Sequence, residues 1–122
     1  MKLIEIYKDS FGIEIDLKYA SNDNITGEKI FLENRCFLLE EAAIKFKKAI
    51  LIAKELDLSF KIYDAYRPSY VQQALWSFDP NPDFLTNPAK GSPHTKGIAI
   101  DLTLIDLKGK ELDMGTKFDD FT

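Results

Sequence analysis

The chain has 122 residues, of which 45% are hydrophobic and 30% charged, as expected for one ordinary globular domain. This composition excludes a disordered tail, a collagen and a repeat array. The formal net charge of -4 matches a phosphate backbone poorly, so we expect no nucleic-acid partner. The single cysteine, Cys36, has no second cysteine for an internal disulfide.

The first residues carry acids and bases before any apolar run forms. This pattern fits neither a signal peptide nor a membrane span. We therefore expect one domain over residues 1–122, in a cytoplasmic protein with no membrane partner.

Two short strands are predicted in the first third of the chain. Residues 13–19 alternate apolar and polar side chains with period two, which is typical of a strand with one buried face. Residues 29–32 form a second candidate strand, and Thr26 and Gly27 supply the turn before it. We expect both segments in one sheet.

A long amphipathic helix is predicted over residues 39–58, because apolar residues recur there at three- and four-residue spacing. Glu40 and Glu41 fall in its first turn, where the helix dipole favours anions. Lys45, Lys47, Lys48 and Lys54 are expected on its solvated face.

Residues 59–66 return to alternation, which predicts a strand. It ends at Arg67 and Pro68, since a proline moves the preceding residue out of helical geometry. Ser69 is expected to cap a helix over residues 70–77.

Four of the five prolines lie between Asp79 and Pro93, which predicts an irregular surface loop. The following residues 97–107 form the strongest strand candidate. A turn at residues 108–110 leads to residues 111–114, so a hairpin is expected.

The only histidine, His94, precedes Asp101 with six residues between them. An imidazole nitrogen and a carboxylate oxygen are both good zinc ligands, and Gly97 would allow the backbone to bend so that they converge. Asp101 lies in an apolar strand, where a metal, a lysine or a hydrogen-bond network would offset its burial. The alternative is an exposed loop histidine and an ordinary strand aspartate.

Arg67, one of only two arginines, lies at the end of a predicted strand in the segment Asp-Ala-Tyr-Arg-Pro, residues 64–68. Its guanidinium group can polarise a carbonyl or hold a carboxylate through two parallel hydrogen bonds. The alternative is a structural salt bridge to Asp64 or another acid.

Together these segments resemble the zinc D-alanyl-D-alanine dipeptidases of the vancomycin-resistance type, within the zinc peptidases that share a His-x6-Asp pair. The likeness rests on residues 64–68 and on Ser-x-His-x-x-Gly-x-Ala-x-Asp, residues 92–101. It extends in order over nearly the whole chain, through residues 16–20, Asn24, Gly27, Cys36, residues 112–116, Phe118 and Asp119.

The resemblance implies a small α+β domain, with an antiparallel sheet, packed helices and a central metal cleft. His94 and Asp101 match two zinc ligands, and Arg67 matches the arginine that stabilises negative charge on the scissile carbonyl oxygen. Near the dipeptide pocket the resemblance places Tyr19, Ser92 and Asp119, the last as a partner of the substrate ammonium group.

The implied activity is zinc-dependent hydrolysis of the D-alanyl-D-alanine dipeptide to D-alanine, with a carboxylate base taking the proton of the attacking water. Members of the family continue to a Glu-x-x-His segment that supplies the base and a third zinc ligand. Because this chain has no second histidine, we interpret it as an N-terminal fragment that lacks the C-terminal part of the fold. A complementing C-terminal fragment is therefore an expected partner, beside the small D-amino-acid dipeptide.

Other completions and other functions stay open at this point. Cys36, Asp119 or Asp120 would have to replace the missing ligand, or a homodimer would have to bring two copies of His94 together. A different class of function is a non-catalytic module that binds D-alanyl-D-alanine or cell-wall peptides through Arg67 and Asp119. A third is a decayed gene product that does not fold alone.

Overall fold

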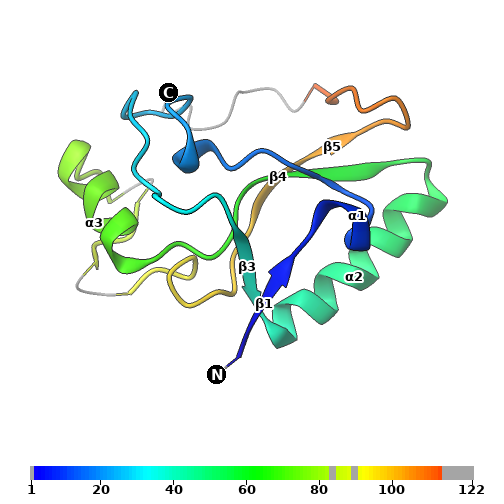
Figure 1. The fold of residues 1–122 in the computed structure, drawn as a ribbon, viewed down its shortest axis with the longest axis horizontal. Helices are drawn as coiled ribbons and strands as arrows, with labels where there is room; N and C mark the ends of the chain where they lie inside the picture. The colour runs from blue at the N-terminus through cyan, green and yellow to red at the C-terminus, as the bar shows by residue number, and fades with distance from the viewer. Residues whose placement is uncertain (1, 83–84, 89–90, 114–122) are drawn as a thin grey trace.

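The computed structural model describes residues 2–82, 85–88 and 91–113. Its described part contains two small sheets and separate helices, so the fold is α+β, as predicted (Figure 1). Among these residues, no helix combines the length and the apolar character that crossing a bilayer requires. One domain over residues 1–122 stays a prediction.

A two-stranded antiparallel sheet joins β1 (Leu3–Ile6) to β3 (Cys36–Leu39). The other sheet has the order β2 (Glu14–Ile15), β4 (Ser59–Asp64), β5 (Asp101–Ile105). Its β4–β5 pair is antiparallel, but β2 runs parallel to β4. The expected antiparallel sheet is therefore mixed, because β2 meets β4 only after the chain has passed through the other sheet and a long helix.

The N-terminal third differs most from the prediction. The strand expected over residues 13–19 shortens to β2, because the chain turns into a 3-10 helix, η1 (Lys18–Ala20). Residues 29–32 form no strand; the amides of Ile30 and Phe31 donate instead to the Tyr19 carbonyl, at 3.0 and 2.7 Å. Strands β1 and β3 and the short helix α1 (Lys8–Phe11) were not predicted.

The predicted long helix is confirmed as α2 (Glu40–Glu55), which lies along the strands and packs against β1, β3 and β4 (Figure 1). Ala43 and Phe46 of α2 enter the main core beside Ile62 of β4, which is completely buried. Burial of this one helix face ties both sheets together. Leu56, one of the apolar residues in the range predicted for this helix, is 67% exposed because α2 ends before it.

Helix α3 (Ser69–Phe78) is confirmed, but Ser69 is its first residue and not its cap. Pro68 occupies the N-cap position, and its carbonyl accepts the amides of Val71 and Gln72. A second apolar cluster joins α3 to the segment after β2 through Tyr19, Phe31, Val71, Leu75 and Leu85.

The loop over residues 79–93 is irregular in its described parts, as expected, but it is not only a surface loop. Leu85 and Ser92 are buried, so the loop packs against α3 and against the end of β4.

The strand expected over residues 97–107 is confirmed over β5 alone. The turn after β5 returns the chain so that Glu111 pairs with Ile105, which confirms the hairpin as far as the described residues go; Met114 lies outside them.

The backbone of Gly97, in the loop before β5, lies in close contact with the start of α2. Its φ is +76°, in the left-handed region that favours glycine, as the predicted backbone bend requires. The Leu39 amide donates to the Gly97 carbonyl at 2.8 Å, and a Cβ on Gly97 would lie 3.2 Å from the Leu39 nitrogen. Only glycine therefore fits this approach without displacing the backbone.

We expect Gly97→Ala to lower the free energy of unfolding by about 2–4 kcal/mol, part from left-handed strain and part from the displaced contact with Leu39. Gly109→Ala is the matched control, because Gly109 has φ +82° but no atom within 4 Å of its would-be Cβ. That control should lose about 1 kcal/mol. Urea unfolding measures both; equal losses would contradict the close-approach argument.

Candidate functional site

A β-bulge sets the position of two acidic residues at the end of the three-stranded sheet. Ile62 of β4 pairs with Leu102 of β5, so regular pairing would place Tyr63 opposite Asp101. The register shifts after Ile62, and Asp64 takes that place instead. An extra residue in one strand re-aims the side chains beyond it. Here it brings two carboxylates together where β4 ends and β5 begins.

The loop that carries His94 is folded tightly by its own backbone. The Ser92 side-chain oxygen accepts the His94 amide at 3.2 Å, and the His94 carbonyl accepts the Gly97 amide at 3.1 Å. That carbonyl also accepts the Arg67 amide at 3.0 Å. The histidine loop and the segment after β4 therefore form one hydrogen-bonded unit.

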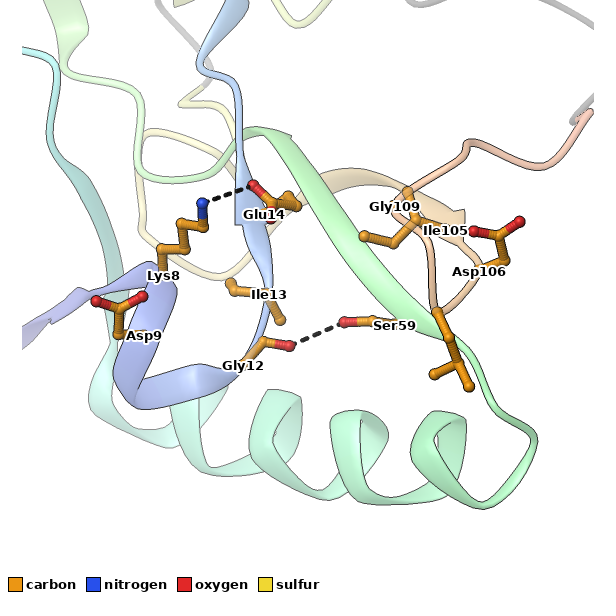
Figure 2. A pocket seen from close by; sticks show the side chains of 10 residues that line it. Lys8, Asp9, Gly12, Ile13, Glu14, Ser59, Ile105, Asp106 and Gly109 are labelled. Atoms are coloured by element: carbon orange, nitrogen blue, oxygen red, sulfur yellow. Dashed lines mark hydrogen bonds and ion pairs between the residues drawn. The ribbon is translucent and has the colours of Figure 1, made fainter.

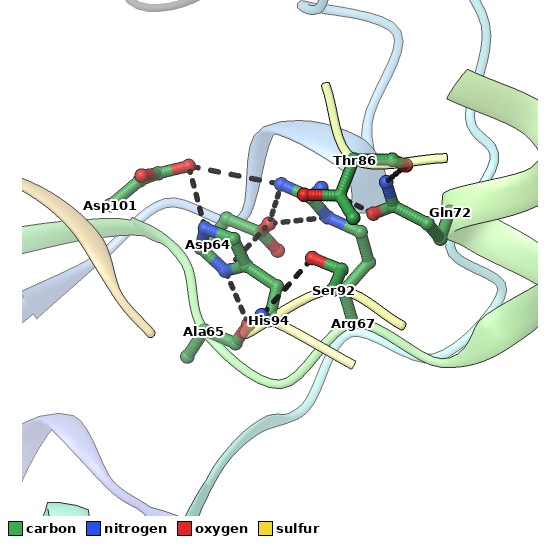
Figure 3. A network of polar contacts seen from close by, with 8 residues as sticks. All are labelled: Asp64, Ala65, Arg67, Gln72, Thr86, Ser92, His94 and Asp101. Carbon is green, nitrogen blue, oxygen red and sulfur yellow. Dashed lines mark hydrogen bonds and ion pairs between the residues drawn. The ribbon is translucent and has the colours of Figure 1, made fainter. Parts of the chain in front are cut away.

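The imidazole of His94 lies between a backbone carbonyl and a carboxylate (Figure 3). Its Nδ1 is 2.9 Å from the Ala65 carbonyl oxygen, and because a carbonyl only accepts, Nδ1 carries the proton. Nε2 lies 3.4 Å from Oδ2 of Asp101. In the neutral imidazole, two electron-rich atoms therefore face each other, and a proton or a metal cation between them is favourable.

Arg67 forms a buried ion pair with Asp64, whose side chains are 5% and 1% exposed. Oδ2 of Asp64 accepts both Nε–H and Nη2–H, at 2.9 and 2.7 Å. Nη2 is also 3.8 Å from Oδ2 of Asp101. The salt bridge considered from the sequence as the alternative role of Arg67 is thus formed, and it points the guanidinium toward the His94–Asp101 pair.

Among the described residues, Asp64, His94 and Asp101 offer ligand atoms that all lie within 4.8 Å of one another, so they are a possible metal-binding group. The three are not equivalent. Asp64 faces Nδ1 of His94, at 3.5 Å, and is already neutralised by Arg67, whereas Asp101 faces Nε2. The chemistry therefore favours His94 and Asp101 as the ligand pair, with Asp64 as the counter-ion of Arg67.

Asp101 is more exposed than the sequence suggested. Its side chain is 41% exposed, because it begins β5 and is not enclosed within it. Burial in an apolar strand, one of the arguments for a metal there, is therefore wrong. What needs a partner is the facing pair of His94 and Asp101.

The proposed pocket residues have different surroundings. Tyr19 is 2% exposed, and its ring centre lies 5.2 Å from Cζ of Arg67, which is a cation–π distance. Ser92 is 3% exposed, and its hydroxyl oxygen accepts the His94 amide. Both lie at the site, but direct contact of either with a dipeptide stays a prediction. Asp119 and Asp120 lie outside the described residues.

Two features of the site were missed or misjudged from the sequence. Gln72 of α3 is 1% exposed and accepts a hydrogen bond from Nη1 of Arg67 at 2.6 Å. Its place between the apolar Val71 and Leu75 on one helix face is the signal that could have found it. Cys36, considered as a replacement ligand, lies in β3 opposite Ile6 and is buried outside the possible metal-binding group.

A hollow of about 380 Å³ lies elsewhere, where α1 meets the start of β4 and the turn after β5 (Figure 2). Lys8 forms an ion pair with Glu14 there, at 3.3 Å, and the Ser59 hydroxyl donates to the Gly12 carbonyl at 2.9 Å. None of its lining residues belongs to the site around His94.

A family model described as D-ala-D-ala dipeptidase matches residues 1–122. The chain belongs to the D-Ala-D-Ala dipeptidase family. A D-alanyl-D-alanine dipeptidase of Escherichia coli strain K12 is 47% identical over 88% of this chain. Those of Enterococcus faecium and Enterococcus faecalis are 34% and 31% identical, again over 88% of it. The chain spans 56% of the length of the E. coli relative and 64% of each enterococcal one.

The ionisation of this family member's site follows from burial and pairing. Burial raises the pKa of the Asp64 carboxyl to about 6, against the opposing charges of Arg67 and His94. Burial and the charge of Arg67 lower the pKa of His94, but the hydrogen bond to Asp101 and the charges of Asp101 and Asp64 outweigh them, so this pKa lies above its usual value. Burial raises the pKa of the Cys36 thiol to about 12, which disfavours the thiolate that binds metals.

We expect Asp64→Asn to lower the free energy of unfolding by about 3–5 kcal/mol, because it leaves a buried guanidinium without a counter-charge. Glu5→Gln is the matched control, since it removes the carboxylate of the other arginine, the half-exposed Arg35. The Arg35 side chain is 55% exposed, so losing its partner should change stability far less. Chemical unfolding of the two variants would contradict a structural role for Asp64 if their losses were alike.

Proposed function

We propose that this chain supplies zinc-binding and oxyanion-stabilising residues to a site that hydrolyses the D-alanyl-D-alanine dipeptide. The observation that carries the proposal is the facing of His94 Nε2 and Asp101 Oδ2 at 3.4 Å, with Arg67 Nη2 at 3.8 Å from the same oxygen. Membership of the family and the names of the relatives support the substrate class.

The donor atoms suit zinc. Neutral imidazole nitrogen and carboxylate oxygen are ordinary zinc ligands, and the Ala65 carbonyl fixes the tautomer that turns the Nε2 lone pair toward Asp101. When bound, zinc polarises a carbonyl and lowers the pKa of a coordinated water to about 7. His94 and Asp101 would hold it, while Asp64 stays with Arg67.

Arg67 is suited to stabilise a developing oxyanion. Asp64 and Gln72 engage three of its five N–H groups, and the other two have no hydrogen-bond partner within the described ranges. A preorganised donor of this kind acts where negative charge forms in the transition state. Arg67 is 4% exposed, so water would screen the interaction of its guanidinium group with such a charge only weakly.

The proposed site needs a base and one more ligand. A catalytic zinc usually has three protein ligands and one open position, and the chain contains one histidine. We propose that a complementing C-terminal fragment supplies the Glu-x-x-His segment that the resemblance implies. A cytoplasmic location, where free dipeptide would be met, is part of the same proposal.

Zinc binding is the first test. We expect calorimetric titration of zinc into the 122-residue chain to show one site that His94→Ala and Asp101→Asn each weaken about 10-fold to 100-fold or more. Cys36→Ala and Asp9→Asn are the controls, one for the alternative ligand and one for an exposed carboxylate. Equal affinities in all folded variants would remove the proposed ligand pair.

Activity is the second test. D-alanine release from the dipeptide is measured in the presence of zinc in two samples. One contains the chain alone, and the other also contains, as the complement, the part of the E. coli relative that lies beyond the matched region. We expect release with the complement, and a loss of about 10²-fold or more in kcat for Arg67→Lys, which keeps the charge but loses the fork of donors.

Arg35→Lys is the matched control, because Arg35 is the other arginine of the chain and lies on the surface, paired with Glu5. Its activity should equal that of the unchanged chain. No release from a folded, zinc-loaded and complemented sample would overturn the hydrolytic proposal. Heat of dipeptide binding in that sample would then indicate the non-catalytic module.

A further inference from the structure

We propose that Gln72 is a positioning residue for Arg67, and that the acceptor atom of its side chain sets the orientation of the guanidinium. Gln72 belongs to α3 and is 1% exposed. Its Oε1 accepts Nη1–H of Arg67 at 2.6 Å, and its Nε2 donates to the Thr86 carbonyl at 2.7 Å (Figure 3). The side chain therefore links Arg67, which follows β4, to the loop that carries Thr86.

The direction of the Gln72 amide is fixed by its two neighbours. The Thr86 carbonyl only accepts hydrogen bonds, and the guanidinium of Arg67 only donates them. Nε2 must therefore face Thr86, and Oε1 must face Arg67. The opposite orientation of the amide would place like groups together at both ends. Only this orientation of the amide satisfies both partners.

The second contact fixes what the ion pair leaves free. Asp64 holds the edge of the guanidinium formed by Nε and Nη2, through a single oxygen, Oδ2. A planar group held at one point can still tilt about that point. Gln72 holds Nη1, on the other side of Cζ, while the Tyr19 ring lies 5.2 Å from Cζ. Together they define the guanidinium plane and the directions of its two remaining N–H groups.

The neighbouring glutamine provides a contrast within the same helix. Gln73 is exposed and bonds only within its helix, to the Ser77 hydroxyl at 3.2 Å, among the contacts of the described residues. An apolar side chain would fill the buried position of Gln72 as well by volume. It would leave an N–H of Arg67 and the Thr86 carbonyl each with one partner fewer, which is costly in a buried place.

The catalytic consequence rests on the proposed function, but the orientation of the guanidinium does not. The orientation and its catalytic consequence can be tested separately, because NMR detects the side-chain nitrogen signals of arginine whether or not the chain is active. The chain has only two arginines, the buried Arg67 and the half-exposed Arg35, so each serves as a reference for the other.

The experiment compares the full chain with Gln72→Met, Gln72→Glu and the control Gln73→Met. We expect separate, slowly exchanging Nη signals for Arg67 in the unchanged chain and in Gln73→Met. In Gln72→Met these signals should exchange about tenfold faster or more, the ratio expected for loss of one hydrogen bond to a charged group. Gln72→Glu loses the donor to Thr86 but keeps an acceptor for Nη1 and adds a negative charge beside the guanidinium, so it should keep them slow.

Several outcomes would overturn the proposal. Unchanged Arg67 signals in folded Gln72→Met would do so, as would equal loosening in the Met and Glu variants, which would indicate packing alone. If Gln72→Met does not fold, the unchanged chain and Gln72→Glu decide. Arg67 signals as averaged as those of Arg35, in the unchanged chain or in Gln72→Glu, would then overturn it.

Kinetics tests the catalytic consequence in the complemented sample. Gln72→Met should lower kcat about tenfold with a smaller change in KM, and should have no further effect in an Arg67→Lys background. An equal loss in that background would overturn action through Arg67. Absence of activity in the unchanged chain concerns the proposed function, and the NMR comparison still decides the role of Gln72.

Discussion

The buried ion pair of Arg67 and Asp64 is the interaction on which the rest of the site depends. Removing both charges from water is expensive, and attraction between them offsets this only when the geometry is good and the remaining donors have partners. Asp64 satisfies two N–H groups, Gln72 a third, and the Tyr19 ring covers one side. The sheet bulge, α3 and the segment before β3 are all needed to assemble this environment, so the ion pair couples the site to both apolar clusters.

The elements that could be predicted are those whose apolar pattern is long and local. Helix α2, strand β4 and helix α3 each repeat their own period over enough residues to be recognised without their neighbours. Strand β3 was missed because its four residues are all apolar and show no alternation, and because the predicted helix was begun at Leu39. The parallel contact of β2 with β4 depends on pairing across distant sequence, which no local pattern contains.

Prediction of the site had the same limit. His94, Asp101 and Arg67 were found because their residue types and spacing belong to recognisable motifs, and the structure brings them together. The motif did not show that one step of register, at Tyr63, is what places Asp64 opposite Asp101. It also did not show that Ser92 bonds the His94 backbone. Such roles depend on hydrogen-bond geometry, which residue identity alone does not fix.

The two carboxylates of the site, Asp64 and Asp101, have different partners. Nη2 of Arg67 is 2.7 Å from Asp64 and 3.8 Å from Asp101, so the arginine has its own counter-ion and does not rely on the second. A cation bound by His94 and Asp101 would therefore leave the arginine paired. Asp64 and Arg67 are both buried, whereas in the proposed ligand pair the side chain of His94 is 14% exposed and that of Asp101 41%, so Asp101 faces the solvent. Because Asp64 and Gln72 hold the guanidinium without help from Asp101, it is oriented before any ligand arrives, as the proposed oxyanion stabilisation requires.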